Sequence, residues 1–220
     1  MGIFITFEGI EGCGKTTQLG LVADSLDTKG FNCLITREPG GTGIGEKVRK
    51  ILLSSQNSEI MPVTELFLYM ASRSQHVEEV IKPALADNKI VLCDRFSDAT
   101  IAYQAYARGI DLESVKELNQ LATSGLKPDI TVLLDCPVDI GLARATGRMS
   151  SQISQMREDR FEREDISFHQ RVREGYLEIG RDEDERVLII DGTRDMDIVH
   201  EEICKTVFSK ITEGRGKNVI

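Results

Sequence analysis

The chain has 220 residues, of which 40% are hydrophobic and 29% charged. This composition is that of an ordinary globular protein and excludes disordered and collagen-like chains. The formal net charge of −9 argues against a broad nucleic-acid-binding surface, because such surfaces are usually basic. The length suits a single large α/β domain, which we expect to span residues 1–212, with a flexible tail at 213–220.

The cysteines and the N-terminus predict where the protein resides. The five cysteines are odd in number and never spaced as CxxC, which indicates a reducing compartment and no structural zinc. The first residues, MGIFITFEGIEG, have no basic region and are unlike a signal peptide. No apolar run approaches the roughly 18 residues of a membrane span. We therefore expect a soluble, cytoplasmic protein that binds neither nucleic acid nor membrane.

Short apolar runs alternate with helical patterns along the chain. Strands are expected at 2–7, 31–36, 89–93, 129–134 and 186–190. Helical patterns fill the gaps, including 15–28, 65–86, 114–123 and 196–211. Strands that alternate with helices predict a five-stranded parallel sheet with helices on both faces. Residues 144–164 become polar, Arg-rich and weakly periodic, and we expect a mobile lid there.

A phosphate-binding loop lies between the first strand and the first helix. Residues 9–16 read GIEGCGKT and fit the pattern GxxxxGK[ST] at every fixed position. Backbone N–H groups of such a loop surround phosphate oxygens, the lysine reaches the β- and γ-phosphates, and the hydroxyl ligates magnesium. The alternative is a glycine-rich turn with an incidental lysine. The expected ATP-binding residues are Gly9, Ile10, Glu11, Gly12, Cys13, Gly14, Lys15, Thr16 and Thr17.

This loop predicts a P-loop nucleoside triphosphate hydrolase fold but leaves the reaction open. A GTPase would carry the base-reading motif NKxD, whereas the Asn-Lys pair here continues as Asn88-Lys89-Ile90-Val91. A motor or transport ATPase usually needs a longer chain. A small α/β chain with additional arginines indicates a kinase of small molecules.

An acid and an arginine follow the third expected strand. Ligands of open parallel sheets bind at the carboxyl ends of the strands, where Asp94 and Arg95 lie. Asp94 can hold magnesium or its water, and Arg95 can clamp a phosphate with two parallel hydrogen bonds. The alternative is an Asp-Arg ion pair that only joins the edge of the sheet.

The expected helix over 65–86 carries an aromatic ring and a guanidinium. Phe67 and Arg73 are six residues apart, or about 9 Å along a helix axis, a separation that suits stacking on a base and reaching its carbonyl edge. The alternative for Phe67 is packing in the core.

Five blocks of sequence resemble bacterial thymidylate kinases, in family order, over roughly residues 1–195. They are FEGIEGCGKTTQ from Phe7, TREPGGT from Thr36, LFLYMASRSQH from Leu66, DRFSDATIAYQ from Asp94 and DRFE from Asp159. The resemblance implies a homodimeric enzyme that transfers the γ-phosphoryl group of ATP to dTMP, with Mg²⁺, giving dTDP and ADP.

The resemblance also implies roles for individual residues. Phe67 would stack on the thymine and Arg73 would hydrogen-bond it, while Tyr103 would disfavour a ribose 2′-hydroxyl. For Arg49 and Glu8, a solvated or sheet-edge charge is the alternative. The expected dTMP-binding residues are Glu8, Arg37, Arg49, Phe67, Arg73, Arg95, Thr100, Tyr103 and Gln104. The expected metal-binding residues are Thr16 and Asp94.

The lid supplies further arginines. Arg144 and Arg148 share one face of a helix, and Arg157, Arg160 and Arg163 follow. Interleaved acids make a solvated face the alternative interpretation. Some thymidylate kinases carry a basic residue inside the P-loop and others take it from the lid. Because the loop interior here has no basic residue, we expect the catalytic residues to be Lys15, Arg95, Arg144, Arg148 and Arg157.

Two other functions remain open at this stage. The first is a P-loop kinase for another nucleoside monophosphate or a deoxynucleoside. The second is a nucleotide-binding regulatory module that has lost catalysis, against which Lys15, Thr16, Asp94 and Arg95 argue. The acceptor phosphate is already an anion near neutral pH, so no strong general base is expected.

Overall fold

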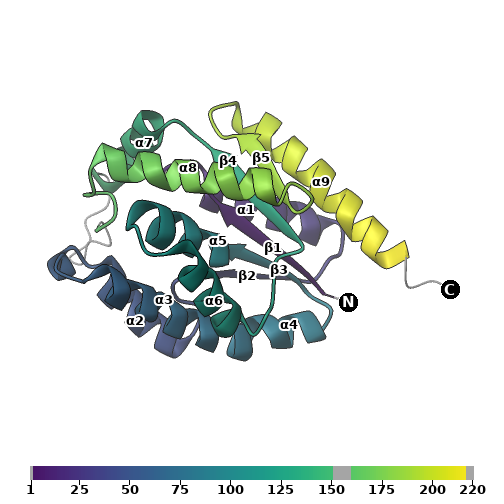
Figure 1. The fold of residues 1–220 in the computed structure, drawn as a ribbon. Helices are drawn as coiled ribbons and strands as arrows, with labels where there is room; N and C mark the ends of the chain where they lie inside the picture. Colours follow the sequence, from purple (N-terminus) through teal and green to yellow (C-terminus); the bar gives the residue numbers. More distant parts are fainter. Residues whose placement is uncertain (1, 151–159, 217–220) are drawn as a thin grey trace.

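The computed structural model describes residues 2–150 and 160–216 (Figure 1). The strands are β1 (Ile3–Glu8), β2 (Cys33–Arg37), β3 (Ile90–Asp94), β4 (Ile130–Asp135) and β5 (Val187–Asp191). The α-helices are α1 (Lys15–Thr28), α2 (Gly43–Leu53), α3 (Pro62–His76), α4 (Lys82–Ala86), α5 (Ser97–Thr100), α6 (Leu112–Thr123), α7 (Val138–Ser150), α8 (Ile166–Asp182) and α9 (Met196–Gly216). The remaining helical segments of the described residues are one short 3₁₀ turn, η1 (Ser55–Asn57), and two π-helical segments, η2 (Val77–Ile81) and η3 (Ile101–Ala107).

The five strands form one parallel sheet in the order β2-β3-β1-β4-β5, which confirms the predicted fold class. Each strand overlaps its predicted range and ends one residue later than predicted. The register pairs Phe7 and Arg37 with Asp94, so the carboxyl ends of β1, β2 and β3 lie side by side. This edge of the sheet brings the P-loop, Arg37 and the Asp94-Arg95 pair together.

Helices cover both faces of the sheet. Side chains along β1 point alternately to the two faces, and because apolar side chains lie on both, both faces must be covered. Ile5 and Phe7 belong to the large core cluster that includes residues of α1 and α9. Phe4, on the opposite face, packs with residues of η2 and contacts Phe96 edge-on, with ring centroids 4.8 Å apart. Among the described residues, no helix has the length and apolar character needed to cross a bilayer.

The expected single helix over 65–86 is interrupted. It runs as α3, the π-helical segment η2 and the short helix α4. Pro83 lies at the start of α4, where its missing N–H removes one regular helical hydrogen bond. The second π-helical segment, η3, carries Tyr103 and Gln104; such wide turns are rare and often occur at functional sites.

Two stretches expected to be irregular are ordered differently. Helix α7 continues through Ser150, so residues 146–150 are helical, and residues 213–216 belong to α9 rather than to a tail. Arg160, grouped above with the lid arginines, is buried and donates to the backbone oxygen of Leu52 and to Glu65. Arg157 lies outside the described residues, and of Arg148 only the helical backbone is described.

Candidate active site

The P-loop joins β1 to α1 and depends on glycine at two close approaches. Gly9 and Gly12 have positive φ values, +135° and +74°. A Cβ atom on Gly12 would lie 1.9 Å from the Gly141 oxygen, and one on Gly9 would lie 2.4 Å from the Leu134 oxygen. No side chain therefore fits at either position, and the loop keeps its backbone N–H groups available for an anion.

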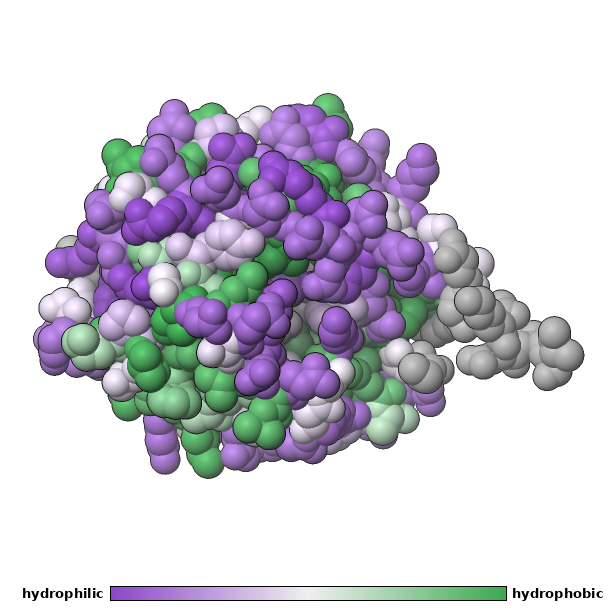
Figure 2. All heavy atoms as spheres, in the orientation of Figure 1, coloured by the Kyte–Doolittle hydropathy of each residue, from purple (hydrophilic) through white to green (hydrophobic). Residues whose placement is uncertain are grey.

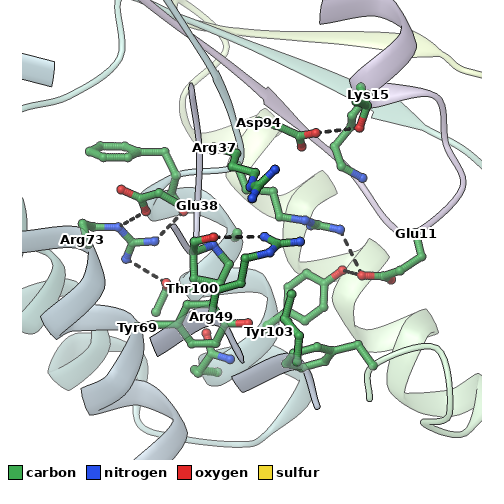
Figure 3. A pocket seen from close by; sticks show the side chains of 18 of the residues that line it. Glu11, Lys15, Arg37, Glu38, Arg49, Tyr69, Arg73, Asp94, Thr100 and Tyr103 are labelled. Carbon is green, nitrogen blue, oxygen red and sulfur yellow. Dashed lines mark hydrogen bonds and ion pairs between the residues drawn. The ribbon is translucent and has the colours of Figure 1, made fainter. Parts of the chain in front are cut away.

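Two polar side chains at the start of α1 make different contacts, one within the P-loop and one with the end of β3. The Lys15 ammonium donates to the backbone oxygens of Gly9, at 3.1 Å, and Ile10, at 2.8 Å. The Thr16 hydroxyl donates to Asp94 Oδ2 at 2.7 Å (Figure 3). The two expected metal-binding residues are thus in direct contact.

A cavity of about 330 Å³ opens beside the P-loop at the carboxyl edge of the sheet; we call it the first cavity (Figure 3). Most of the expected acceptor residues and part of the P-loop line it. They are Glu11, Gly12, Lys15, Thr16, Arg37, Arg49, Arg73, Asp94, Arg95, Thr100, Tyr103 and Gln104. Sequence reasoning missed several other lining residues, namely Glu38, Tyr69, Phe96, Phe161 and Glu162.

Arg73 is held at one end of the first cavity by a dense set of hydrogen bonds. Its side chain is 1% exposed and donates to Glu38, Thr100 and Asn119 and to the backbone oxygen of Phe96, at 2.7–2.8 Å. A guanidinium has five N–H groups, so one remains for a ligand beside these four bonds. Glu38 is fixed in turn by His76, whose Nδ1 lies 3.0 Å from Oε1.

The aromatic residue at this end of the cavity is Tyr69 rather than Phe67. The ring of Phe67 is 55% exposed and is not among the lining residues, so both its stacking role and the core-packing alternative are wrong. Six residues of α-helix turn through about 600°, which places Phe67 on a different face from Arg73. Four residues turn through about 400°, so Tyr69 lies on the same face. This i, i+4 spacing was the signal available in the sequence.

Arg95 occupies the other end of the first cavity. Its Nη2 donates to Glu11 at 3.0 Å, while Nη1 donates to the Gly9 oxygen at 3.0 Å and the Tyr176 hydroxyl at 2.9 Å. The guanidinium also lies 5.0 Å from the centroid of the Tyr103 ring. Its backbone φ of +69° is rare for a non-glycine residue. Asp94 bonds to Thr16 while Arg95 turns to Glu11, which argues against a simple Asp-Arg pair at the sheet edge.

Glu11 is the acidic partner of Arg95 inside the P-loop. Its Oε1 also accepts a 2.5 Å hydrogen bond from the Tyr103 hydroxyl. Burial alone would raise the pKa of Glu11, but the charge of Arg95 and the proximity of His169, Lys15 and Tyr103 outweigh it. The pKa therefore lies well below its usual range, and Glu11 is an anion.

Glu8 lies behind the cavity rather than in it. The side chain is fully buried at the end of β1 and accepts hydrogen bonds from Phe96 N, at 2.7 Å, and from the Tyr176 hydroxyl, at 2.6 Å. Burial, reinforced by Asp98, raises the pKa of Glu8 from 4.5 to about 7, although Arg95 opposes the shift. The position fits the sheet-edge alternative better than direct contact with an acceptor.

Arg37 and Arg49 line the mouth of the first cavity. Arg37 forms a partly exposed ion pair with Glu46 at 3.0 Å, and Arg49 donates to the backbone oxygen of Pro39 at 3.0 Å. Together with Arg95 and Lys15 they place four cationic groups on the wall nearest the P-loop. This end of the cavity suits an anion.

A second cavity, of about 590 Å³, lies on the other side of the P-loop. Arg144, from α7, reaches it and donates to the Gly192 oxygen at 3.0 Å. The remaining lining residues are Gly12, Cys13, Gly14, Thr17, Gln18, Gly147, Gly192, Arg194, Met196 and Val199. Seven of the nine predicted ATP-binding residues line one or both of these cavities, with the P-loop between them. The other two, Gly9 and Ile10, line neither, and Ile10 is buried in the core.

Two cavities that meet at a P-loop, with cations around the junction, define a P-loop phosphotransferase with separate places for a donor and an acceptor. The comparisons with known proteins narrow this class. A model of the family described as thymidylate kinase matches residues 7–203, and the chain belongs to this family.

Individual relatives agree with the family match. The chain is 57% identical to a thymidylate kinase of Geotalea daltonii over 211 residues, which cover 96% of this chain and 99% of the relative. It is 49% identical to a thymidylate kinase of Geobacter sulfurreducens over 211 residues, with the same coverage of both chains. A crystal structure of the Ehrlichia chaffeensis thymidylate kinase superposes with a TM-score of 0.73 at 36% identity, covering 94% of this chain and 98% of that one.

Proposed function

We propose that the protein transfers the γ-phosphoryl group of ATP to dTMP, giving dTDP and ADP. The observation that carries this proposal is the buried Arg73, held rigidly at one end of the first cavity with Thr100 beside it, opposite the arginines at the other end. At one end, Arg73 has its charge paired with Glu38 and offers hydrogen bonds; at the other end lie cations, across a space suited to a nucleoside monophosphate. Family membership supports the same reaction.

The two ends of the first cavity would bind different parts of the acceptor nucleotide and so fix its orientation. Tyr69 would stack on the base, while Arg73 would donate its remaining N–H to a base carbonyl. Arg95, with Arg37 and Arg49, would bind the phosphate and turn its oxygen towards the P-loop. The Tyr103 ring, fixed by Glu11, would fill the space beside the sugar.

The second cavity would hold the donor. Backbone N–H groups of the P-loop and the Lys15 ammonium would surround the β- and γ-phosphates. Arg144 reaches this cavity from α7, so an arginine of the predicted lid does lie beside the P-loop. Because an ionised phosphate oxygen attacks, the residues need only to align the two nucleotides and to stabilise charge.

Magnesium is the cofactor that the P-loop implies. Thr16 and Asp94 present a hydroxyl and a carboxylate oxygen at one point, and oxygen ligands of this kind suit Mg²⁺. Among the described residues, no group of three or more His, Cys, Asp or Glu side chains is placed to hold a metal ion. In nucleotide-binding sites, Mg²⁺ usually takes most of its ligands from water and substrate phosphates. Bound there, the ion would supply positive charge to the β- and γ-oxygens.

A coupled ADP-release assay with ATP, Mg²⁺ and a panel of nucleoside monophosphates tests the acceptor. dTMP should be the best substrate and dUMP a weaker one. If AMP, CMP or GMP outperforms dTMP, the enzyme is a kinase for another nucleotide. If no monophosphate stimulates ADP release, the proposal fails altogether.

We also infer that the protein forms a homodimer in the cytoplasm. Exposed apolar side chains gather over α2, α3 and α6, where Figure 2 shows hydrophobic surface in the lower part of the molecule. They include Val63 and Phe67, one helical turn apart on α3, and Leu121 on α6. All five cysteines are free thiols, which is typical of a reducing compartment.

Light scattering after size exclusion tests the dimer. Wild-type protein should have the mass of two chains, and Phe67→Asp should shift it towards one chain. Ile198→Asp is the matched control, because Ile198 is similarly exposed but lies on α9, away from this surface. A monomeric wild type would contradict the inference, and so would a Phe67→Asp variant that remains dimeric.

A further inference from the structure

His169 is a fully buried histidine beside the P-loop, and the mechanism above gives it no role. It lies on α8 with a side-chain exposure of 0%, and its Nδ1 is 3.3 Å from Glu11 Oε2. Neither of its ring nitrogens, nor Glu11 Oε2, has a hydrogen-bond partner of ordinary geometry among the described residues. A neutral imidazole always carries one N–H, so a donor and an acceptor are buried next to each other here.

A buried donor and a buried acceptor that lack hydrogen bonds both lower the stability of the fold. A small movement of the His169 ring would let Nδ1–H donate to Glu11 Oε2 and would remove this cost. Glu11 Oε1 is already committed to Arg95 and Tyr103, so Oε2 is the oxygen that still needs a donor. His169 is the side chain placed to supply one. The bond would fix the carboxylate plane of Glu11 and, through Oε1, the direction of Arg95.

The same face of α8 contacts Arg95 a second time. Tyr176 is seven residues, or two helical turns, beyond His169, and such residues share a face. Its hydroxyl accepts a hydrogen bond from Arg95 Nη1 at 2.9 Å and donates to Glu8. Arg95 is therefore held on one side by Tyr176 directly and on the other by Glu11, which His169 faces.

We propose that His169 is a positioning residue, whose Nδ1–H donates to Glu11 Oε2 and thereby aims Arg95 at the acceptor phosphate. This inference rests on the proposed role of Arg95 in binding that phosphate. Two substitutions of His169 distinguish a role for the hydrogen bond from Nδ1 from a role for the side chain in packing. Asn places its amide nitrogen near the position of Nδ1, whereas Gln places it near that of Nε2.

The test measures kcat and KM for dTMP and for ATP in four variants: His169→Asn, His169→Gln, Glu11→Gln and the double variant His169→Gln/Glu11→Gln. His169→Gln should lower kcat/KM for dTMP roughly 10-fold, the scale of one hydrogen bond to a charged group, with the KM for ATP unchanged. His169→Asn should restore most of the loss. In the Glu11→Gln background, His169→Gln should have little further effect, because the two residues act in series.

Besides unimpaired activity of His169→Gln, two results would overturn the proposal. One is equal impairment of the Asn and Gln variants with equal losses of thermal stability, which would show that His169 only fills space. The other is full additivity with Glu11→Gln. Arg95→Ala, measured in the same series, separates this proposal from the one on which it rests. A normal KM for dTMP in Arg95→Ala would refute the role of Arg95. An impaired Arg95→Ala beside a normal His169→Gln would refute only the positioning role.

Discussion

The two cavities that meet at the P-loop are built in different ways. In the first cavity, buried side chains hold one another: Arg73 makes four hydrogen bonds and Arg95 makes three to side chains or backbone. The second cavity is wider, and glycine backbone forms much of its wall. We infer that choice of acceptor depends on side-chain geometry, whereas donor binding depends on backbone N–H groups and on Arg144, which reaches the second cavity from α7.

The largest expected effect tests the donor side. Replacing Arg144, Arg148 and Arg157 together with Ala should lower kcat by roughly 10³-fold or more, the range known for arginines that act on a transferred phosphoryl group. Affinity for dTMP, measured by calorimetry, should stay near wild type because Arg144 lines the second cavity. Lys at these positions should restore little, since a point charge cannot bridge two phosphate oxygens.

Arg171→Ala is the control for this variant, because Arg171 is exposed on α8 and donates to Ser167 in its own helix. A near-normal kcat in the triple variant would leave Lys15 and Arg95 as the cations that act in catalysis. Catalysis would then depend on cations that line the first cavity, and not on the arginine that lines the second.

Lys15→Ala tests the point where the cavities meet. The substitution removes an ammonium expected to contact both phosphates, so kcat should fall by roughly 10²–10³-fold, as for other single electrostatic donors. Steady-state kinetics of a variant with an unchanged circular dichroism spectrum would measure this. Lys116→Ala, on the exposed surface of α6, should be indistinguishable from wild type. Normal turnover in Lys15→Ala would show that the loop does not act as a phosphate cradle.

Tyr69 and Phe67 provide a matched pair on the acceptor side. Tyr69→Leu should raise the KM for dTMP roughly 10-fold, because base-aromatic stacking is worth about 1–3 kcal/mol. Phe67→Leu should leave that KM unchanged, since Phe67 is exposed and is not among the residues that line the cavity. Equal effects of the two substitutions would contradict the assignment of Tyr69.

The last expected effect concerns Glu8 and is an effect on stability rather than on activity. Its pKa is raised from 4.5 in the unfolded chain to about 7 in the folded one, so the folded state binds more protons between these values. Stability from this group is therefore present below about pH 4.5 and is lost as the pH rises to 7, by about 3 kcal/mol in total. In Glu8→Gln, denaturant unfolding at pH 5 and pH 7.5 should show a smaller fall than in wild type. An identical fall would mean that Glu8 does not titrate in this range.

The sheet and the P-loop could be predicted because their signals are local. A buried strand followed by GxxxxGK[ST] determines what residues 3–28 form, and the alternation of strands and helices determines the fold class. It was harder to predict from the sequence which face of α3 lines the first cavity. The i, i+4 spacing places Tyr69, and not Phe67, on the same face as Arg73, but only the packing of the helix shows that this face lines the cavity.

Partners distant in sequence account for the other differences. Arg160 lies among interleaved charges that are typical of a solvated face, yet it is buried against Glu65, 95 residues earlier in the chain. Glu38 stands inside the quoted motif TREPGGT, but its role in holding Arg73 depends on how α3 crosses the end of β2. The proposed role of His169 likewise depends on its contact with Glu11 in the P-loop, which is distant in the sequence.

The π-helical segment η3 has a consequence for how this enzyme could change its substrate. A π turn contains one residue more than an α turn. Deleting one residue of η3 would close this wide turn, and the residues that remain inside it would move by about 100° around the helix axis while the helical residues on either side kept their positions. Some of the contacts that η3 makes with α8 would then change, and so would the directions of Tyr103 and Gln104, which line the first cavity. A one-residue deletion in η3 is therefore expected to alter acceptor binding without replacing any residue that lines the cavity.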